Sequence, residues 1–313
     1  MSASPSSLDP AGPGAQDIAT LWWILLAAGT AVFVLVLALF VVPLLRRRRD
    51  EAGDRADVPA GKAARWIVWL GIVLPTVVLT GVLVVTVLTM RSVSRAAPEG
   101  SVQIDVTGYQ FWWAATYPEH GVTVANELHI PVGEPVELRL TSADVIHSFW
   151  VPELHGKLDL LPETTNTLVL EADEPGIYGG ECAEFCGLQH ANMGFLVVAQ
   201  PRDEFDAWLA AQRAPAAAPT SGQAERGEQV FLDADCGSCH TIRDVTAADR
   251  SGPDLTHVAS RRTLASDTLD NTTANLERWL RDPAAVKVGT TMPTPDLTAE
   301  QLAALVAYLE GLE

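Results

Sequence analysis

Two long apolar stretches dominate the N-terminal part of the chain. Residues 21–45 read LWWILLAAGTAVFVLVLALFVVPLL, and residues 66–90 read WIVWLGIVLPTVVLTGVLVVTVLTM. Each exceeds the roughly 20 apolar residues that a helix needs to cross a bilayer. A signal sequence has a shorter apolar core, and a helix apolar on all sides would need a much larger soluble core to bury it. The pattern therefore predicts two transmembrane helices.

The segment between these stretches is basic, whereas the first 20 residues contain no Lys or Arg. Its basic residues are Arg46, Arg47, Arg48, Arg49, Arg55, Lys62 and Arg65. Short loops rich in Lys and Arg stay on the cytoplasmic side of a membrane. We therefore expect a cytoplasmic connector, with everything after residue 90 on the outer face.

Alternating hydrophobic and polar positions replace the continuous apolar pattern after the second stretch. Val102, Ile104 and Val106 alternate with polar residues, and Gly, Pro, Asn and Asp punctuate the later extended stretches. These stretches are residues 101–117, 122–130, 135–141, 166–171 and 194–200. Short strands at this spacing are typical of a β-sandwich or barrel. Residues 202–211 place Phe205, Trp208 and Leu209 on one face of a predicted amphipathic helix.

The last third of the chain forms a separate predicted domain. Residues 212–223, QRAPAAAPTSGQ, have the Ala, Pro and Ser content of a linker. Helices are predicted over 224–233 and 298–312, the second beginning with a capping box formed by Thr298 and Gln301. The predicted parts are therefore residues 1–96 for the tail and membrane helices, 97–211 for the strand-rich domain, 212–223 for the linker and 224–313 for the helical domain.

The net charge of −18 is concentrated outside the predicted membrane part. Residues 97–213 hold 4 basic and 18 acidic residues, and residues 214–313 hold 8 basic and 15 acidic residues. Binding to nucleic acid needs Lys and Arg opposite the phosphates, so the composition argues against it. An acidic surface suits a basic protein partner, although a solvated surface without a partner has the same composition.

A cluster of soft donor residues lies in CAEFCGLQHANM. Cys182, Cys186, His190 and Met193 fall within twelve residues, and thiolate, thioether and imidazole ligands together select copper over hard cations. One copper would use a single Cys, whereas two Cys can bridge two metal ions. The second imidazole for such a site is offered by His147, in the strand-rich region. The alternative is a Cys182–Cys186 disulfide with the other residues in the core or at the surface.

A second constellation begins with Cys236, Cys239 and His240, in the order C-x-x-C-H that attaches haem c. GPDL follows at residues 252–255, and Met292 precedes a proline before the last predicted helix. A His and Met pair raises the potential of haem iron, which suits an electron carrier. A thioredoxin-like redox pair is the alternative, but no βαβ pattern surrounds the cysteines. Met292 could also be a core residue.

The first constellation, with HSFWVPEL at 147–154 and GKLD at 156–159, resembles the binuclear copper A (CuA) site of cytochrome c oxidase subunit II. The resemblance covers residues 21–209 and implies two membrane helices followed by a cupredoxin-like β-sandwich. It implies that Cys182 and Cys186 bridge both coppers. It also implies that the remaining ligands are His147, His190, Met193 and the backbone carbonyl of Glu184. The carboxylate of Glu184 would face a magnesium or manganese ion shared with subunit I.

The second constellation is similar to class I cytochromes c. That similarity implies an all-α domain in which Cys236 and Cys239 hold haem c covalently, with His240 and Met292 as axial ligands. The chain as a whole is then a multidomain membrane protein. We expect a tethered haem on a flexible linker, at high effective concentration near its acceptor.

Together the two resemblances imply a subunit of a cytochrome c oxidase, an oxidoreductase and translocase of the bacterial plasma membrane. Electrons would reach haem c from a cytochrome c or a cytochrome bc-type complex, pass to CuA, and continue to subunit I. Oxygen would be reduced to water there, coupled to proton translocation by the complex. The expected partners are subunit I and the other oxidase subunits, with no nucleic acid. The chain would be multi-pass, with CuA and haem c on the extracytoplasmic face.

Other classes of protein fit less well. A membrane-anchored cytochrome without an enzyme partner would not need His147 or Met193, and a copper chaperone would not need the second span or a haem. Quinol oxidase subunit II has a similar architecture but lacks the copper cysteines. Nitrous oxide reductase uses CuA, but its large propeller domain has no room in this chain.

Two further features are less specific. The aromatic run at residues 109–113 is of the kind that lies beside CuA in the family, although this chain has Phe111 where many members have Trp. The histidines outside both motifs are expected at the surface. They are His120, His129, His155 and His257.

Overall fold

The computed structural model describes residues 6–47, 60–247 and 251–313, and these form two compact units. One unit is Gln16–Arg95, and the other joins Met1–Ala15 to Ala96–Glu313. Three basic residues of the predicted cytoplasmic connector, Arg48, Arg49 and Arg55, lie outside the described residues.

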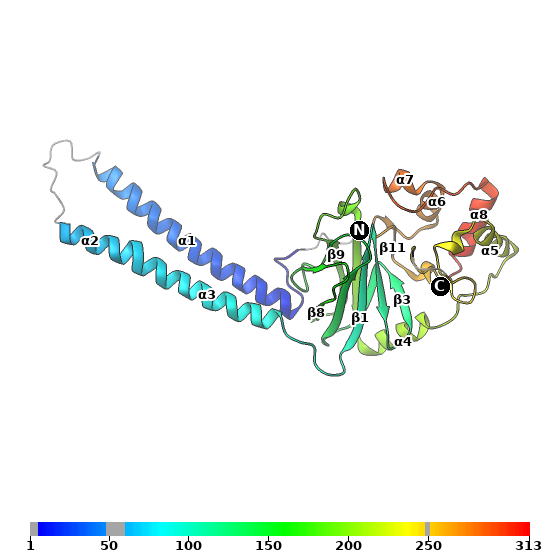
Figure 1. Ribbon diagram of the computed structural model, residues 1–313, viewed down its shortest axis with the longest axis horizontal. Coiled ribbons are helices and arrows are strands. Elements are labelled where there is room, and N and C mark those ends of the chain that lie inside the picture. The colour runs from blue at the N-terminus through cyan, green and yellow to red at the C-terminus, as the bar shows by residue number, and fades with distance from the viewer. Residues whose placement is uncertain (1–5, 48–59, 248–250) are drawn as a thin grey trace. The chain divides into compact units, whose positions relative to one another are not determined.

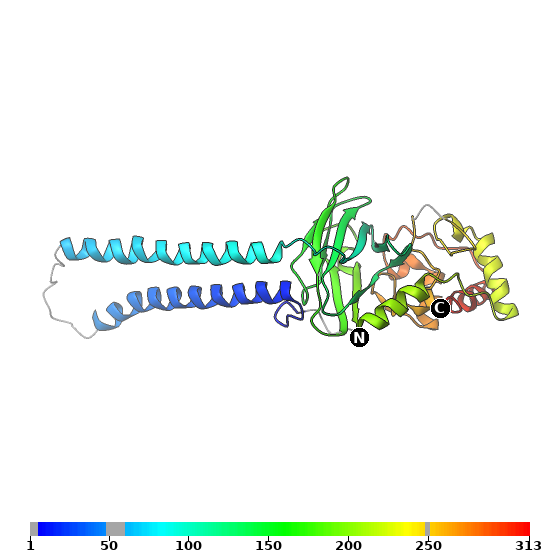
Figure 2. The same cartoon turned by 90° about the horizontal axis from the view of Figure 1, so that it is seen from below.

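Two long apolar helices make up the first unit, and Figures 1 and 2 show them side by side. The first is α1, Pro13–Arg47. The second runs without a break through α2, Ala60–Val68, the π-helical turn Trp69–Val73 and α3, Leu74–Val93. Both are long and apolar enough to cross a membrane, and the side chains of their most apolar stretches are not buried within the described residues. The prediction of two such helices is confirmed.

Local chemistry explains the details of these helices. Pro75 lies at the start of α3. Proline has no N–H and its ring collides with the carbonyl of the preceding turn, which accounts for the wider π turn just before it. The hydroxyl of Ser92 donates to the carboxylate of Asp17, so the end of α3 lies beside the start of α1. The helix α1 begins eight residues before the predicted position, because residues 13–20, which include the polar Gln16, Asp17 and Thr20, are also helical.

The second unit contains a sandwich of two five-stranded sheets (Figure 1). The order is β3-β2-β1-β5-β8 in one sheet and β4-β10-β9-β6-β7 in the other. The pairs β1–β5 and β4–β10 are parallel, and the remaining pairs are antiparallel. The strands are β1 Val102–Tyr109, β2 Trp112–Tyr117, β3 Val122–Ala125, β4 Glu127–Pro131, β5 Val136–Ser142, β6 His147–Trp150, β7 Leu158–Leu160, β8 Asn166–Leu170, β9 Gly176–Cys182 and β10 Gly194–Gln200.

The inward faces of the two sheets enclose one apolar core. Alternate residues of β1 and β5 are buried, as the alternation in the sequence predicts, and Trp113, Phe149 and Phe195 pack edge to face or stacked in its centre. The helix α4, Arg202–Gln212, closes the domain with Phe205 and Leu209 buried, as predicted. The β-sandwich prediction is therefore confirmed.

Three strands were not predicted, and two of them carry site residues. The strand β9 contains glycine at three of its seven positions, a composition that weakens the strand signal in a sequence. Gly180 is required there by packing, since a Cβ atom at this position would lie 2.2 Å from the ring of Phe195. The short strands β6 and β7 pair mainly with each other and with β9.

The expectation that the histidines outside the motifs lie at the surface is wrong for three of them. His129, His155 and His257 are buried, each with polar partners. His129 stacks on Trp208 with ring centroids 4.0 Å apart, and its ring nitrogens lie 3.1 Å from Glu127 and Gln200. The ring nitrogens of His257 lie close to two backbone carbonyl oxygens. A buried histidine needs such partners for its polar atoms, and sequence spacing does not reveal them.

The last domain packs helices around its own core. Its elements are α5 Gly222–Asp233, the 3-10 turns Cys236–Ser238 and Val258–Ser260, the strands β11 Thr263–Leu264 and β12 Leu269–Asp270, α6 Thr273–Arg281, α7 Pro283–Val286 and α8 Ala299–Leu309. The helices α5 and α8 cross closely, since a Cβ atom at Gly227 would lie 2.0 Å from the carbonyl oxygen of Ala304. The predicted capping box of Thr298 and Gln301 is present. The hairpin β11–β12 is an addition to the predicted helices.

Residues 213–221 connect α4 to α5. The side chain of Arg243 donates to the backbone carbonyls of Gln212 and Ala214 at 2.9 and 3.0 Å. Ser221 caps α5 by accepting from the amide of Ala224, so this helix begins two residues before the predicted start. The first residues of the predicted linker therefore contact the domain that follows.

Candidate metal centre and haem site

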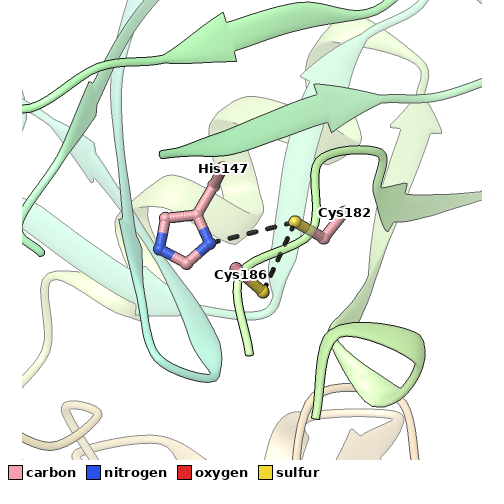
Figure 3. Close-up of side chains that lie close together, drawn as sticks. All are labelled: His147, Cys182 and Cys186. Atoms are coloured by element: carbon pink, nitrogen blue, oxygen red, sulfur yellow. Dashed lines mark hydrogen bonds between the residues drawn. The ribbon is translucent and has the colours of Figure 1, made fainter. Parts of the chain in front are cut away.

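The strands of the second sheet bring the predicted copper ligands together. Cys182 is the last residue of β9, and Phe149 of β6 pairs with it across the sheet. His147 begins β6 and therefore lies next to the end of β9. The chain then loops through Cys186 to a 3-10 turn, His190–Asn192, and enters β10 after Met193. Figure 3 shows His147, Cys182 and Cys186 pointing toward one another.

The donor atoms of these residues are close neighbours. The sulfurs of Cys182 and Cys186 are 3.8 Å apart, and the Nδ1 atom of His147 lies 3.8 Å from the Cys182 sulfur. The Cys186 sulfur lies 3.8 Å from Nδ1 of His190 and 3.7 Å from the sulfur of Met193. The carbonyl oxygen of Glu184 lies 3.2 Å from the Cys182 sulfur. Every ligand that the resemblance implies is thus next to at least one of the two cysteine sulfurs.

Burial and protonation make this cluster a strong candidate for a metal. His147, Cys182, Cys186 and Met193 are all buried. The hydrogen bond between the two thiols lowers the pKa of Cys182 against the effect of burial, while the same bond and burial raise the pKa of Cys186. The two thiols are therefore coupled, and the Cys182 thiol ionises more readily than the Cys186 thiol. A bound metal ion would compensate the negative charge of the thiolates in this buried space.

Asp144 orients His147 from the other side of the ring. Its Oδ1 atom lies 2.8 Å from Nε2 of His147, which leaves Nδ1 facing Cys182. Burial alone would lower the pKa of His147, but the hydrogen bonds with Cys182 and Asp144 raise it. A carboxylate on the far nitrogen is a common way to fix a metal-binding histidine. Sequence reasoning missed Asp144, although its position three residues before His147 is a usable signal.

The donor set fits copper better than the alternatives. Two thiols, two imidazoles, a thioether and a carbonyl are soft or borderline ligands, and they do not suit magnesium or calcium. The 3.8 Å between the cysteine sulfurs is far beyond a disulfide bond of about 2.0 Å, and both cysteines are free. Among the described residues, His147, Cys182 and Cys186 form the one close group of three or more His, Cys, Asp or Glu side chains.

The C-x-x-C-H motif forms a tight turn after α5. Cys236 begins a 3-10 turn, and the amide of His240 donates to the Cys236 carbonyl at 3.0 Å. Both cysteines are half-buried and free. Nδ1 of His240 lies 2.7 Å from the carbonyl oxygen of Pro253, so Nε2 is on the side of the ring that points away from this carbonyl. Pro253 belongs to the predicted GPDL segment, so that segment positions the histidine.

The surroundings of His240 fit a haem ligand. Burial lowers the pKa of His240, with the carbonyl of Pro253 acting in the opposite direction, so the ring is neutral at pH 7 and able to bind iron. Gly252 allows close approach, since a Cβ atom there would lie 2.8 Å from the His240 ring. Cys236 and Met292 both pack against the apolar core of this domain. The predicted haem residues therefore belong to one domain, with His240 held in a single orientation.

Comparison with known proteins agrees with both parts of this structure. Residues 120–200 match the family described as cytochrome c oxidase subunit II, periplasmic domain, and residues 224–313 match the cytochrome c family. These matches imply a CuA copper centre in the first and a haem in the second. The crystal structure of the periplasmic domain of subunit II from Bradyrhizobium japonicum is 28% identical, with a TM-score of 0.36, and the match covers 38% of this chain and 97% of that one.

Relatives extend the match along the chain. The cytochrome c oxidase subunit 2 of Bacillus sp. (strain PS3) is 34% identical over 287 residues, which cover 86% of this chain and 80% of that protein. The cytochrome c oxidase subunit 2 of Alkalihalophilus pseudofirmus is 40% identical over 315 residues, which cover 98% of this chain and 91% of that protein. The chain therefore belongs to the cytochrome c oxidase subunit 2 family, and a cytochrome c domain is fused behind its oxidase domain.

Proposed function

We propose that this chain is the subunit through which electrons enter a haem–copper terminal oxidase. It receives electrons at haem c, passes them to CuA, and delivers them to subunit I for the reduction of oxygen to water, coupled to proton translocation. The observation that carries the proposal is the convergence of six copper donors in one domain and a C-x-x-C-H motif in the next.

The residues of the copper domain would hold two coppers in a fixed cage. Cys182 and Cys186 would hold both ions, and the other ligands would be His147, His190, Met193 and the Glu184 carbonyl. Bound CuA supplies a one-electron carrier whose charge is spread over two metals and two sulfurs. The strands β6, β9 and β10 keep the ligand positions fixed, so little rearrangement accompanies each electron. The Glu184 carboxylate is proposed to face a magnesium or manganese ion shared with subunit I.

The residues of the second domain would hold haem c. Cys236 and Cys239 would hold the haem through thioether bonds, and His240, through Nε2, and Met292 would be the iron ligands. This ligand pair gives the haem a high potential, which suits an acceptor of electrons from a cytochrome c or a cytochrome bc-type complex. Acidic residues outnumber basic residues in 97–313, which favours association with a soluble electron donor that has a basic surface.

The proposed location is a bacterial plasma membrane, with two passes and both redox domains outside. The support is the pair of apolar helices and the basic residues between them, among which Arg46, Arg47, Lys62 and Arg65 are described. Subunit I and the other oxidase subunits would contact these helices, since the most apolar stretch of each is not buried within the described residues.

One kinetic experiment tests both the order of electron flow and the membrane face. Reduced soluble cytochrome c, which does not cross membranes, is mixed with right-side-out vesicles that contain the oxidase and an inhibitor of the oxygen site. Haem c absorbance is expected to change first and CuA absorbance second, because the haem domain faces the donor. Inside-out vesicles serve as the control and should show neither change. Reduction of CuA before haem c would contradict the order, and a response only in inside-out vesicles would reverse the topology.

A further inference from the structure

We propose that a specific clasp holds the haem domain on the copper domain, and that this closed arrangement is the one in which electrons pass between them. The clasp consists of Ser266, Lys287 and the backbone of Val288 on the haem side, and of Phe111 and Gln189 on the copper side. The proposal rests on the proposed function, since it concerns the step from haem c to CuA. In this arrangement the haem domain makes a defined contact with the copper domain and does not move freely on its linker.

The first part of the clasp is the tip of the β11–β12 hairpin. Ala265, Ser266 and Asp267 have φ angles of 52°, 57° and 58°, the left-handed region that residues other than glycine rarely adopt. Such conformations persist where surrounding contacts hold them. The hydroxyl of Ser266 is buried and lies 2.7 Å from the carbonyl oxygen of Phe111 in the copper domain. The strained tip is therefore shaped for contact with the other domain.

Lys287 is the second part. Only 2% of this residue is exposed, and its Nζ atom donates to the carbonyls of Phe111 and Ala265, each at 3.1 Å. It thus joins the hairpin tip to the same carbonyl that Ser266 contacts. Burial lowers the pKa of Lys287 to about 8, so the amine is still largely protonated at pH 7. Among the described residues no carboxylate lies within ion-pair distance of it. The hydrogen bonds of this buried ammonium that the structure shows go to carbonyls, and the nearby Cys186 raises its pKa against the effect of burial. Such a group is unfavourable for packing alone, which points to a positioning role.

The third part joins the two ligand loops directly. Gln189 is buried and donates from Nε2 to the carbonyl of Val288 at 2.8 Å, while Asn192 holds its Oε1 atom at 2.8 Å. Gln189 immediately precedes the proposed copper ligand His190, and Val288 lies four residues before Met292. The loop that carries Met292, the proposed iron ligand, is therefore hydrogen-bonded to the loop that carries His190, the proposed copper ligand.

The carbonyl of Phe111, which accepts from both Ser266 and Lys287, is also connected to the proposed copper site. Phe111 follows Gln110, whose side-chain amide donates to the backbone carbonyl of Cys186. A separate contact supports the same arrangement, since the amide of Arg262 donates to the buried carboxylate of Glu127 at 3.0 Å. Hydrogen bonds and short stretches of backbone thus connect the haem domain with Cys186. A freely tethered domain would sample many geometries, whereas the clasp selects one.

The test uses the assembled oxidase with the full chain and compares Lys287→Met and the milder Ser266→Ala with matched controls. Arg226→Gln removes a positive charge from an exposed position of α5, and Ser260→Ala removes a hydroxyl that bonds within the haem domain. Amide hydrogen exchange is followed by mass spectrometry in peptides covering residues 109–113 and 260–268. The rate of electron transfer from haem c to CuA is measured by flash photolysis at two solvent viscosities.

Both clasp variants should exchange faster in the two peptides together, while exchange in α8 and the β-sandwich core stays as in the parent and in the controls. Electron transfer in Lys287→Met should fall roughly tenfold, the factor that corresponds to about 1.4 kcal/mol, and should become slower in viscous solvent. The parent rate should not depend on viscosity. Unchanged exchange in Ser266→Ala and Lys287→Met, or a parent rate that already follows viscosity, would overturn the clasp. Absence of copper or haem from the parent would instead refute the proposed function, and the exchange data would still decide the clasp.

Discussion

Replacing Cys186 with serine should remove both coppers and stop electron transfer beyond haem c. The Cys186 sulfur is buried and lies within 3.8 Å of the donor atoms of Cys182, His190 and Met193, which are the contacts that a bridging thiolate would need. A serine hydroxyl is a hard ligand that does not hold copper in this way. We expect turnover to fall more than about a hundredfold, since even altered outer partners of metal ligands typically cost 10- to 100-fold.

The measurement is elemental copper per chain, together with the visible spectrum of the purified oxidase. Haem c should be unaffected, because the haem domain has a core of its own. Cys239→Ser is the matched control, and it should keep its copper while altering haem attachment. Two coppers and an unchanged copper spectrum in Cys186→Ser would show that the cysteine is not a ligand.

Removal of the residues from Ala214 onward should leave an assembled oxidase that keeps its copper but loses most turnover with its native donor. The core of the β-sandwich is formed by residues between Ile104 and Leu209, so the remaining domain has what it needs to fold. The lost domain would have supplied haem c at high local concentration beside CuA. We therefore expect a fall on the order of tenfold to a hundredfold, in line with the gain that tethering provides.

Adding soluble cytochrome c to the truncated oxidase should restore part of the turnover, since the copper centre is then reached by a free carrier. Oxygen consumption with and without this addition is the measurement, and copper content is the control for folding. Full activity with the native donor alone would exclude the haem domain from the electron path. Loss of copper would show that the two domains form one structural unit.

Much of the architecture could be predicted because its signals are local. Continuous apolar stretches predict membrane helices, alternation at Val102, Ile104 and Val106 predicts a strand, and Thr298 with Gln301 predicts a helix start. The copper donors stand out because cysteine and methionine are rare in this chain. Their assignment as ligands stays a prediction, although the structure brings their donor atoms together.

Other features depend on contacts between distant segments, which a single sequence does not reveal. The glycine-rich strand β9 is recognisable only from its partners β6 and β10. His129 is buried because Trp208, far along the chain, covers its ring. The burial of Lys287 could not be predicted either, since a lone lysine in a sequence predicts a solvated side chain. Only the fold places its amine against the carbonyl of Phe111.

The central claim is that one chain carries a two-copper centre and a covalently attached haem. Copper and haem are measured per chain in the purified oxidase subunit, and the haem is challenged by extraction into acidified acetone. We expect two coppers for each chain and one haem that stays with the protein. A single copper, or a haem that leaves the chain on extraction, would contradict it.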